Sequence, residues 1–266
     1  MDLSHPKIMG ILNITPDSFY SGSRVVAEAD MLEMTEKMLS EGADMLDIGG
    51  YSTRPGAEDI TINDEIKRTV KAIEVIISKF PEAIISIDTF RSQVAAAAIN
   101  AGAGIVNDIS GGTLDEDMFD TVASLRCPYI LMHMRGTPQT MAKQTSYEDV
   151  ALDVLNDLEK KVNNLRLKGV KDIIVDPGFG FAKTVEQNFK LLKNLKFFKT
   201  LQLPVLVGVS RKSFIYKTIH STPESALNGT SVLHTLALTN GAQILRVHDI
   251  QEAVEVVNLV AKYDAV

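Results

Sequence analysis

Short apolar segments alternate with longer, more polar segments along the whole chain of 266 residues. The apolar segments are three to seven residues long and rich in Ile, Val, Leu and Met, which is typical of buried strands and too short for helices. They lie at residues 8–14, 45–48, 84–88, 105–107, 129–132, 173–176, 205–209 and 244–247. The pattern therefore predicts eight buried strands.

The segments between these strands repeat apolar residues at every third or fourth position, as helices that cover a sheet must. One such segment has its apolar residues at Ile66, Val70, Ile73 and Ile77. Glycine readily adopts the left-handed conformation found at helix C-termini. Four of the predicted helices therefore end, just before the next strand, at Gly42, Gly102, Gly169 and Gly241.

Eight strand and helix units of about 30 residues each predict a (β/α)8 TIM barrel. A doubly wound parallel sheet is the alternative, because periodicity alone does not establish that a sheet closes on itself. No proline-rich or serine-rich linker and no change of composition divides the chain. We therefore expect a single domain over residues 1–266.

Composition narrows the classes of partner and location. The 27 Lys and Arg residues against 34 Asp and Glu residues give a net charge of −7, which disfavours nucleic acids and anionic membranes as partners. No apolar run reaches the length of about eighteen residues that predicts a membrane span, and the first residues do not resemble a secretory signal. Cys127 is the only cysteine, so an internal disulfide is excluded. We expect a cytoplasmic protein.

Each predicted strand runs into a polar residue at or just after its carboxyl end. These residues are Asn13, Asp47, Asp88, Asn107, His133, Asp176, Ser210 and Arg246 with His248. Because the carboxyl ends of barrel strands meet on one face, the pattern predicts a functional site there. At Asp176 the chain also turns sharply through Pro177 and Gly178. The alternative for Asp176 is that it caps a helix beginning near Thr184.

The residue types at the strand ends indicate the chemistry of a ligand. A flat heterocycle whose edge alternates donors and acceptors would suit Asp88, Asn107 and Asp176. A carboxylate can accept two parallel N–H hydrogen bonds from an amino-pyrimidinone edge, such as that of a pterin. Lys212 adds a donor for a ring carbonyl or nitrogen. The alternative for Lys212 is an exposed residue at the start of a helix.

An anion site is predicted beside this heterocycle site. Arg246 and His248 are two residues apart and point to the same side of a strand, where they suit a phosphate group. Asn13 can share Mg²⁺ with phosphate oxygens, because this ion is commonly bound by few protein ligands. The long polar segments that follow the first two strands are candidates for loops that close over a substrate. Motifs of metalloproteases, P-loop proteins and dinucleotide-binding folds are absent from the sequence.

Together, these segments resemble those of dihydropteroate synthases, which are pterin-binding enzymes. The matching segments include all eight strand ends in order and read GILNITPDSF, DIGGYSTRPGA, SIDTFRSQVA, NDISGG, LMHMRGTPQTM, IIVDPGFGFAKT, VGVSRKSFI and RVHD. The chain departs from the usual family pattern at Tyr20, Ser23 and Tyr51, which lie in or beside the two polar segments.

The resemblance implies a (β/α)8 barrel that acts as a transferase in folate synthesis and is a target of sulfonamides. It also implies Mg²⁺ as the cofactor and a homodimeric assembly. Its small-molecule substrates would be 6-hydroxymethyl-7,8-dihydropterin diphosphate and p-aminobenzoate. In such enzymes the pterin is held by the residues that match Asp88, Asn107, Asp176 and Lys212. The diphosphate and Mg²⁺ are held by those that match Asn13, Thr53, Arg246 and His248.

The resemblance also assigns residues to the p-aminobenzoate pocket. Asp17 and Arg54 match residues of the two closing loops, and together with Asp88 and Lys212 they are the expected catalytic residues. The walls and the carboxylate contact of the pocket match Pro55, Phe181 and Ser213. Two rival functions are a pterin-dependent methyltransferase, which has no diphosphate to bind, and a non-catalytic pterin-binding protein, for which Asn13, Asp17 and Arg54 would be superfluous.

Overall fold

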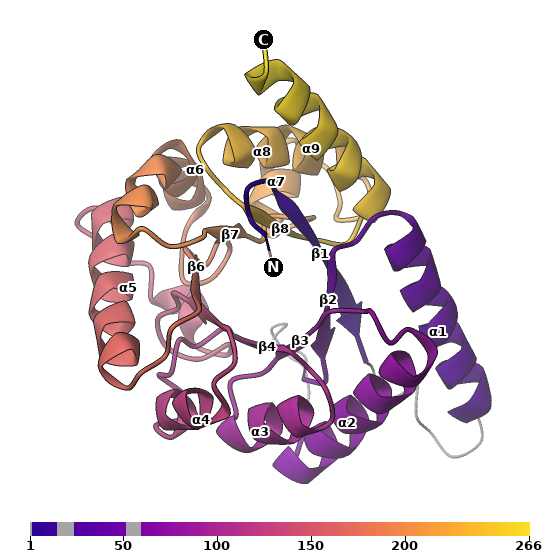
Figure 1. Ribbon diagram of the computed structural model, residues 1–266. Helices are drawn as coiled ribbons and strands as arrows, with labels where there is room; N and C mark the ends of the chain where they lie inside the picture. The colour runs from indigo at the N-terminus through magenta and orange to yellow at the C-terminus, as the bar shows by residue number, and fades with distance from the viewer. Residues whose placement is uncertain (1, 15–23, 52–59) are drawn as a thin grey trace.

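Parallel strands form the centre of the protein and helices surround them (Figure 1). The computed structural model describes residues 2–14, 24–51 and 60–266. Its strands are β1 (Lys7–Asn13), β2 (Met45–Gly49), β3 (Ile85–Asp88), β4 (Ile105–Asp108), β5 (Tyr129–Met132), β6 (Ile173–Asp176), β7 (Leu206–Val207) and β8 (Ile244–Val247). Their order in the sheet is β6-β5-β4-β3-β2-β1-β8-β7, and every named pair is parallel.

The sheet closes between β6 and β7. Val175 forms a parallel bridge with Val205, and the Val175 N–H donates to the Pro204 carbonyl over 2.9 Å. The predicted (β/α)8 barrel is therefore confirmed, and the doubly wound alternative is wrong. β7 is shorter than the predicted 205–209, because the chain already turns at Val209, whose carbonyl accepts the Lys212 N–H over 3.1 Å.

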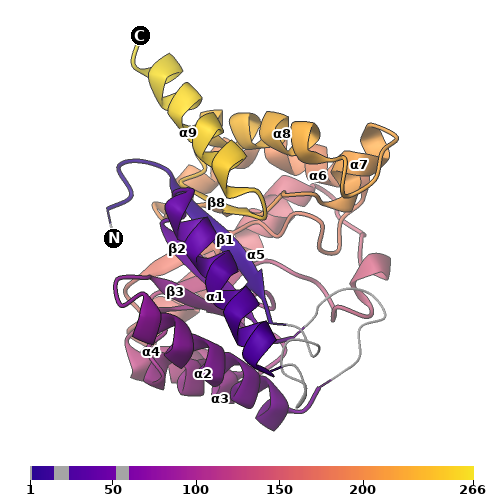
Figure 2. The ribbon, with the colours of Figure 1, turned by 90° about the vertical axis from the view of Figure 1, so that its right-hand side faces the viewer.

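Helices cover the outside of the barrel (Figures 1 and 2). They are α1 (Arg24–Ser40), α2 (Ile62–Lys79), α3 (Ser92–Asn100), α4 (Met118–Leu125), α5 (Val150–Leu167), α6 (Val185–Lys193), α7 (Ser213–Thr218), α8 (Leu227–Thr239) and α9 (Ile250–Asp264), with the short 3-10 helices η2 (Met141–Lys143) and η3 (Leu195–Leu201). The four predicted glycine ends are confirmed by positive φ angles of 91° to 113° at Gly42, Gly102, Gly169 and Gly241.

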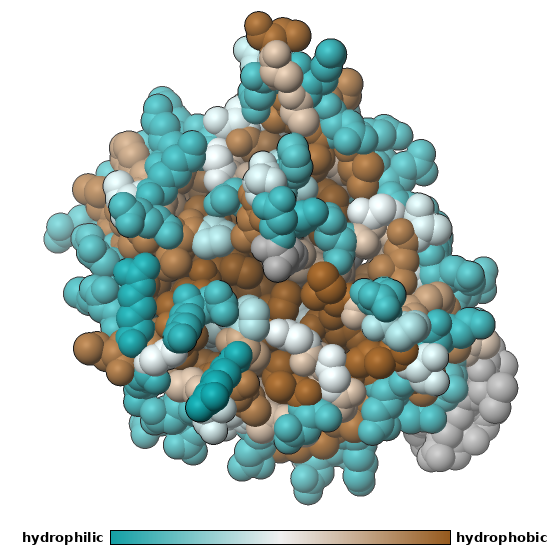
Figure 3. Space-filling view, viewed as in Figure 1, coloured by the Kyte–Doolittle hydropathy of each residue, from teal (hydrophilic) through white to brown (hydrophobic). Residues whose placement is uncertain are grey.

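An apolar layer fills the amino-terminal end of the barrel. It consists of one inward residue from each strand except β3, and Leu3 of the amino-terminal segment packs against it. Figure 3, which views this end, shows hydrophobic residues gathered around the centre and polar residues along the rim. The layer is formed by Met9, Met45, Ile105, Ile130, Ile174, Leu206 and Ile244. This end of the barrel is therefore filled by side chains, as is usual for this fold.

The amino-terminal segment lies at the end of the barrel opposite the carboxyl ends of the strands (Figure 2). Within the described ranges, no helix is both long and apolar enough to cross a membrane.

Candidate active site

A polar layer lies directly above the apolar layer. Because successive side chains of a strand point to opposite faces, the residue two positions after an inward apolar residue also points into the barrel. On β2, β4, β6 and β8 this next residue is polar or charged, and on β3 Asp88 takes the same place after Ser86. The layer therefore brings together Asp47, Asp88, Asn107, Asp176 and Arg246.

Arg246 joins three of these strands. Its Nε donates to Asp47 Oδ2 and its Nη2 donates to Asp88 Oδ2, each over 2.6 Å. Asn107 Nδ2 donates to the same Asp47 oxygen over 2.8 Å. Asp47 is fully buried, whereas 16% of the Asp88 side chain and 19% of the Arg246 side chain are exposed. The guanidinium is thus fixed by two carboxylates at the floor of the barrel mouth.

The pKa values of this cluster are set mainly by burial. Burial raises the pKa of Asp88 to about 7, and the negative charge of Asp47 adds to the effect, while Arg246 opposes it. Burial alone would lower the pKa of Arg246, but Asp47 and Asp88 hold it above its ordinary value. Arg246 therefore stays charged, and Asp88 changes its charge near neutral pH.

Asn13 lies at the edge of this cluster. Its Oδ1 is 3.3 Å from the position that a Cβ atom on Gly49 would occupy, and Asp88 Oδ2 is 3.8 Å from the same position. In the described part of the chain, no group of three or more His, Cys, Asp or Glu side chains could hold a metal ion. One amide oxygen beside a carboxylate fits an ion such as Mg²⁺ that takes most of its ligands from phosphate and water.

Asp176 forms the opposite side of the mouth, and its Oδ1 accepts the Gly178 N–H over 2.7 Å. Burial raises the pKa of Asp176, and the nearby Lys212 ammonium is the main opposing influence. The alternative that Asp176 caps the next helix is wrong, because Thr184 caps α6 in a reciprocal pair of hydrogen bonds with Gln187.

Lys212 reaches back from the start of α7 into the mouth. Its Nζ donates to the Phe179 carbonyl and lies 4.7 Å from the centre of the Phe181 ring. Burial lowers the pKa of Lys212 to about 8, against the opposing charge of Asp176. The alternative of an exposed helix start is therefore wrong. Gly208 of the β7–α7 connection lies between Lys212 and Arg246 and has no side chain to fill the space there. A Cβ atom at this position would lie 3.9 Å from Lys212 Nζ and 3.8 Å from Arg246 Cβ.

The remaining predicted residues fall into two groups. His248 Nδ1 lies 3.0 Å from Ser210 Oγ, which also accepts the His248 backbone N–H over 3.2 Å. Ser213 is the first residue of α7 and is half-buried. The others lie outside the described residues, and they are Asp17, Thr53, Arg54 and Pro55.

Lys183 was not predicted as a site residue. Asp47 was predicted only as one of the polar strand ends, without a role, and nothing in the sequence indicates its pairing with Arg246. Lys183 lies on the β6–α6 loop, where it donates to the carbonyls of Gly178 (2.8 Å) and Phe181 (3.0 Å) and lies 3.2 Å from His133 Nδ1. Burial lowers the pKa of Lys183 to about 7 and that of His133 to about 2, so this imidazole is neutral.

The free energy of unfolding of Lys183→Met is expected to fall relative to that of the wild type by about 2 kcal/mol between pH 6.5 and pH 9. Burial lowers the pKa of Lys183 to about 7, so over this range the unfolded wild type binds a proton that the folded wild type releases, and the variant lacks this gain in stability. Urea denaturation of both proteins at pH 6.5 and pH 9 measures the effect. Lys190→Met is the matched control, since Lys190 is 49% exposed and pairs only with Asp149 among the described residues, so its loss should change stability by less than about 0.5 kcal/mol. Equal losses in the two variants would contradict the role given to Lys183.

Comparison with known proteins agrees with this geometry. The family model described as "Pterin binding enzyme" matches residues 9–248. The dihydropteroate synthase of Synechocystis sp. is 42% identical over 252 residues, which cover 94% of this chain and 87% of the relative.

Two solved structures from Xanthomonas albilineans have the same fold. The dihydropteroate synthase with 4-aminobenzoic acid is 37% identical, with a TM-score of 0.90 over 99% of this chain and 95% of that chain. The complex with 7,8-dihydropteroate is 34% identical, with a TM-score of 0.88 over 100% of this chain and 96% of that chain. The chain therefore belongs to the pterin-binding enzyme family, and its similarity places it among the dihydropteroate synthases of that family.

Proposed function

We infer that the protein is a transferase that joins 6-hydroxymethyl-7,8-dihydropterin diphosphate to p-aminobenzoate and releases 7,8-dihydropteroate and pyrophosphate. One observation carries this inference from the structure. The paired Asp88 and Arg246 share the mouth of one closed barrel with Asp176 and Lys212. Acceptors and donors for a pterin edge thus lie beside a cation suited to phosphate, as the reaction requires.

The pterin would lie across the polar layer. Asp176 Oδ2 would accept N–H groups of the amino-pyrimidinone edge, since Oδ1 already accepts the Gly178 N–H. Asn107 Oδ1 and Asp88 would accept further ring N–H groups, because the Asn107 amide nitrogen is already bound to Asp47. Lys212 would donate to a ring carbonyl or nitrogen. These contacts orient the ring so that its reactive methylene group points out of the barrel.

The diphosphate would lie beside Arg246, His248 and Asn13, with Thr53 as a further contact. Asn13 would hold Mg²⁺ together with phosphate oxygens and water, and the bound ion would help to neutralise the leaving group. Arg246 would add a fixed positive charge without moving, because its two carboxylate partners already orient it.

The reaction exchanges one bond for another at the methylene carbon. The C–O bond to the diphosphate breaks, and its electron pair leaves with the pyrophosphate. The positive charge that develops on carbon is shared with the ring, beside the carboxylates of Asp88 and Asp176. The neutral arylamine nitrogen then forms the C–N bond and loses a proton to solvent, so the step requires no strong base.

The p-aminobenzoate would bind at the outer part of the mouth. Phe181 packs with a small apolar cluster around Met132 and would form one wall, and Ser213 would donate to the carboxylate. Asp17, Arg54 and Pro55 would complete this pocket. Sulfonamides have a similar arrangement of arylamine and acidic group, so we expect them to compete with p-aminobenzoate.

The direct test is release of pyrophosphate by the purified protein. We expect release only when Mg²⁺, the pterin diphosphate and p-aminobenzoate are all present, with dihydropteroate as the second product. Methyl transfer to a corrinoid protein would instead support the methyltransferase rival. Pterin binding without any turnover would support the non-catalytic one.

Pterin affinity is expected to depend on pH with two limbs. It should rise as Asp88 ionises near pH 7, because the carboxylate form accepts ring N–H groups, and fall as Lys212 loses its charge near pH 8. Calorimetric titration with the pterin diphosphate between pH 5.5 and 9.5 measures both limbs. Lys212→Arg should remove the alkaline limb, since arginine stays charged. An unchanged alkaline limb in this variant would rule out Lys212 as its source.

We further propose a homodimer in the cytoplasm. The neighbouring helices α8 and α9 expose Val232, Leu236, Leu259 and Tyr263, each 44% to 73% accessible, and their spacing puts each pair on one helix face. An exposed apolar surface of this kind is typical of an interface. Light scattering tests the proposal, and Leu236→Glu with Leu259→Glu should give a monomer.

A further inference from the structure

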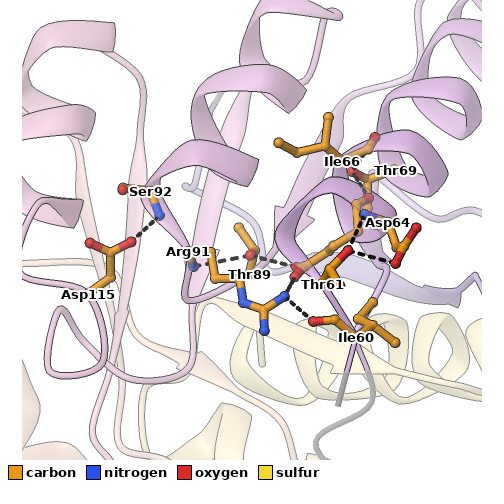
Figure 4. Close-up of polar contacts among 10 residues, drawn as sticks. Ile60, Thr61, Asp64, Ile66, Thr69, Thr89, Arg91, Ser92 and Asp115 are labelled. Atoms are coloured by element: carbon orange, nitrogen blue, oxygen red, sulfur yellow. Dashed lines mark hydrogen bonds and ion pairs between the residues drawn. The ribbon is translucent and has the colours of Figure 1, made fainter. Parts of the chain in front are cut away.

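Arg91 contacts both ends of the connection between β2 and α2. It lies on the β3–α3 connection, three residues after Asp88. Its Nη1 donates to the Ile60 carbonyl over 2.9 Å (Figure 4), and its guanidinium carbon lies 5.1 Å from the centre of the Tyr51 ring. Tyr51 and Ile60 are the described residues that flank positions 52–59.

The guanidinium is itself held in place by a buried carboxylate. Arg91 Nη1 also donates to Glu65 Oε2 over 2.9 Å, and the other Glu65 oxygen accepts the Thr89 hydroxyl over 2.8 Å. The Arg91 backbone N–H donates to the same hydroxyl over 3.2 Å (Figure 4). Glu65 is fully buried on α2. An ion pair with such partners has a defined geometry, unlike an exposed one.

Aromatic contacts complete this cluster. The rings of Tyr51 and Phe90 meet edge to face at 5.1 Å, and Arg91 lies 5.4 Å from the Phe90 ring centre. Cation–π contacts of this kind favour a planar guanidinium over an ammonium group. The β2–α2 and β3–α3 connections are thus joined by one arginine.

The cluster is continuous with the active-site strands. Gly49 of β2 is the register partner of Asp88 on β3, and the Thr89 N–H donates to the Asn107 carbonyl over 3.0 Å. Arg91 therefore places the beginning and end of the β2–α2 connection relative to Asp88. That connection carries Thr53, Arg54 and Pro55 in sequence.

We propose that Arg91 is a positioning residue for the second substrate, p-aminobenzoate, and that it acts by fixing Tyr51 and Ile60 relative to Asp88. This inference rests on the proposed function. The side-chain hydrogen bonds of Arg91 to Ile60 and Glu65 lead toward the β2–α2 connection and α2. Of the expected contacts to the first substrate, Asn107, Asp176 and Lys212 come from other strands and loops. Asp88 is held by Arg246 of β8, and Thr53 is the one expected contact to this substrate on the β2–α2 connection, which also carries Arg54 and Pro55 of the p-aminobenzoate pocket. Loss of Arg91 therefore acts mainly on the second substrate.

The test compares Arg91→Lys and Arg91→Met with the wild type. Lysine keeps a cation beside Glu65, so the fold is retained, but it lacks the planar group over Tyr51 and the second bond. We expect KM for p-aminobenzoate to rise about tenfold in Arg91→Met and by less in Arg91→Lys, while the pterin dissociation constant changes less than about twofold. Equal effects on both substrates would show a general structural role and overturn the proposal.

Asp115→Asn is the matched control. Asp115 Oδ2 accepts the Ser92 N–H over 2.7 Å at the start of the same helix, on the side away from Ile60 (Figure 4). This variant should leave both substrate constants unchanged. If it raises KM for p-aminobenzoate as much as Arg91→Met does, disturbance of α3 explains the effect and the proposal fails.

Amide hydrogen exchange separates this proposal from the proposed function. In Arg91→Lys the amides of residues 49–51 and 60–65 should exchange faster than in the wild type, and those of β6 should not change. Unchanged exchange at 49–51 and 60–65 overturns the role of Arg91, whatever the turnover. A wild-type protein without turnover overturns the proposed function, while the exchange result still decides whether Arg91 fixes these two segments.

Discussion

Asp176→Asn is expected to weaken binding of the pterin diphosphate by about 100-fold or more while leaving the protein at least as stable as the wild type. The loss of affinity follows because hydrogen bonds to a charged acceptor contribute about 1.5–3 kcal/mol each, and the asparagine amide presents a donor to the ring N–H groups. Stability is preserved because the amide oxygen of the new side chain would still accept the Gly178 N–H. Titration calorimetry and urea denaturation measure the two effects.

The sign of the stability effect follows from the pKa of Asp176. Burial raises this pKa, so the ionised carboxylate destabilises the folded state above the ordinary pKa of an aspartate, and the penalty grows as the pH rises. Removing the charge relieves the penalty at pH 7.5. Asp108→Asn is the control, since Asp108 is also buried with a raised pKa but accepts the Tyr129 hydroxyl. If both variants bind pterin like the wild type, the site assignment is wrong.

Arg246→Met is expected to lower the free energy of unfolding by about 3 kcal/mol at pH 8, because Asp47 and Asp88 would remain enclosed without a cation. Turnover should fall below detection, since the fixed charge for the leaving diphosphate is lost. Part of the stability should return at pH 6. Asp88 already has a raised pKa of about 7 in the wild type, and loss of Arg246 raises it further, so protonation at lower pH favours the folded variant.

Urea denaturation of Arg246→Met at pH 6 and pH 8 tests this prediction. Arg211→Met is the control because Arg211 forms a two-bond pair with Asp249 (2.8 and 2.7 Å) that is partly exposed. The decrease in the free energy of unfolding of Arg211→Met should be smaller than that of Arg246→Met and should not depend on pH between 6 and 8. The same pH dependence in both variants would refute the coupling of Asp88 to Arg246.

The strands and their polar ends could be predicted from sequence because both depend on local order. The bounds of β5, β6 and β8 match the prediction residue for residue, since in each case a short apolar run begins and ends abruptly. β7 was predicted too long. Its apolar run continues through Val209, but hydrogen bonding with its neighbours stops at Val207 as the chain begins to turn.

The pairing of charges within the site could not be predicted. Arg246 bonds to Asp47, which is 199 residues away, and only closure of the barrel brings the two together. Lys183 follows a glycine turn like many exposed lysines, and when buried it contacts two carbonyls of its own loop and His133 Nδ1, which follows β5. The order of the sequence therefore indicates which side chains share one face of the barrel, whereas the distances between these side chains depend on how the barrel closes.

The apolar layer that fills the amino-terminal end of the barrel also limits how molecules reach the site. Because side chains such as Met9, Met45 and Ile244 close that end, substrates and products have to enter and leave at the carboxyl ends of the strands. In the proposed binding mode the pterin ring lies deeper in the barrel than the arylamine, so a pterin that arrived second would find its path blocked. Substrate binding is therefore expected to be ordered, with the pterin diphosphate first and p-aminobenzoate second, and dihydropteroate is expected to leave through the same opening.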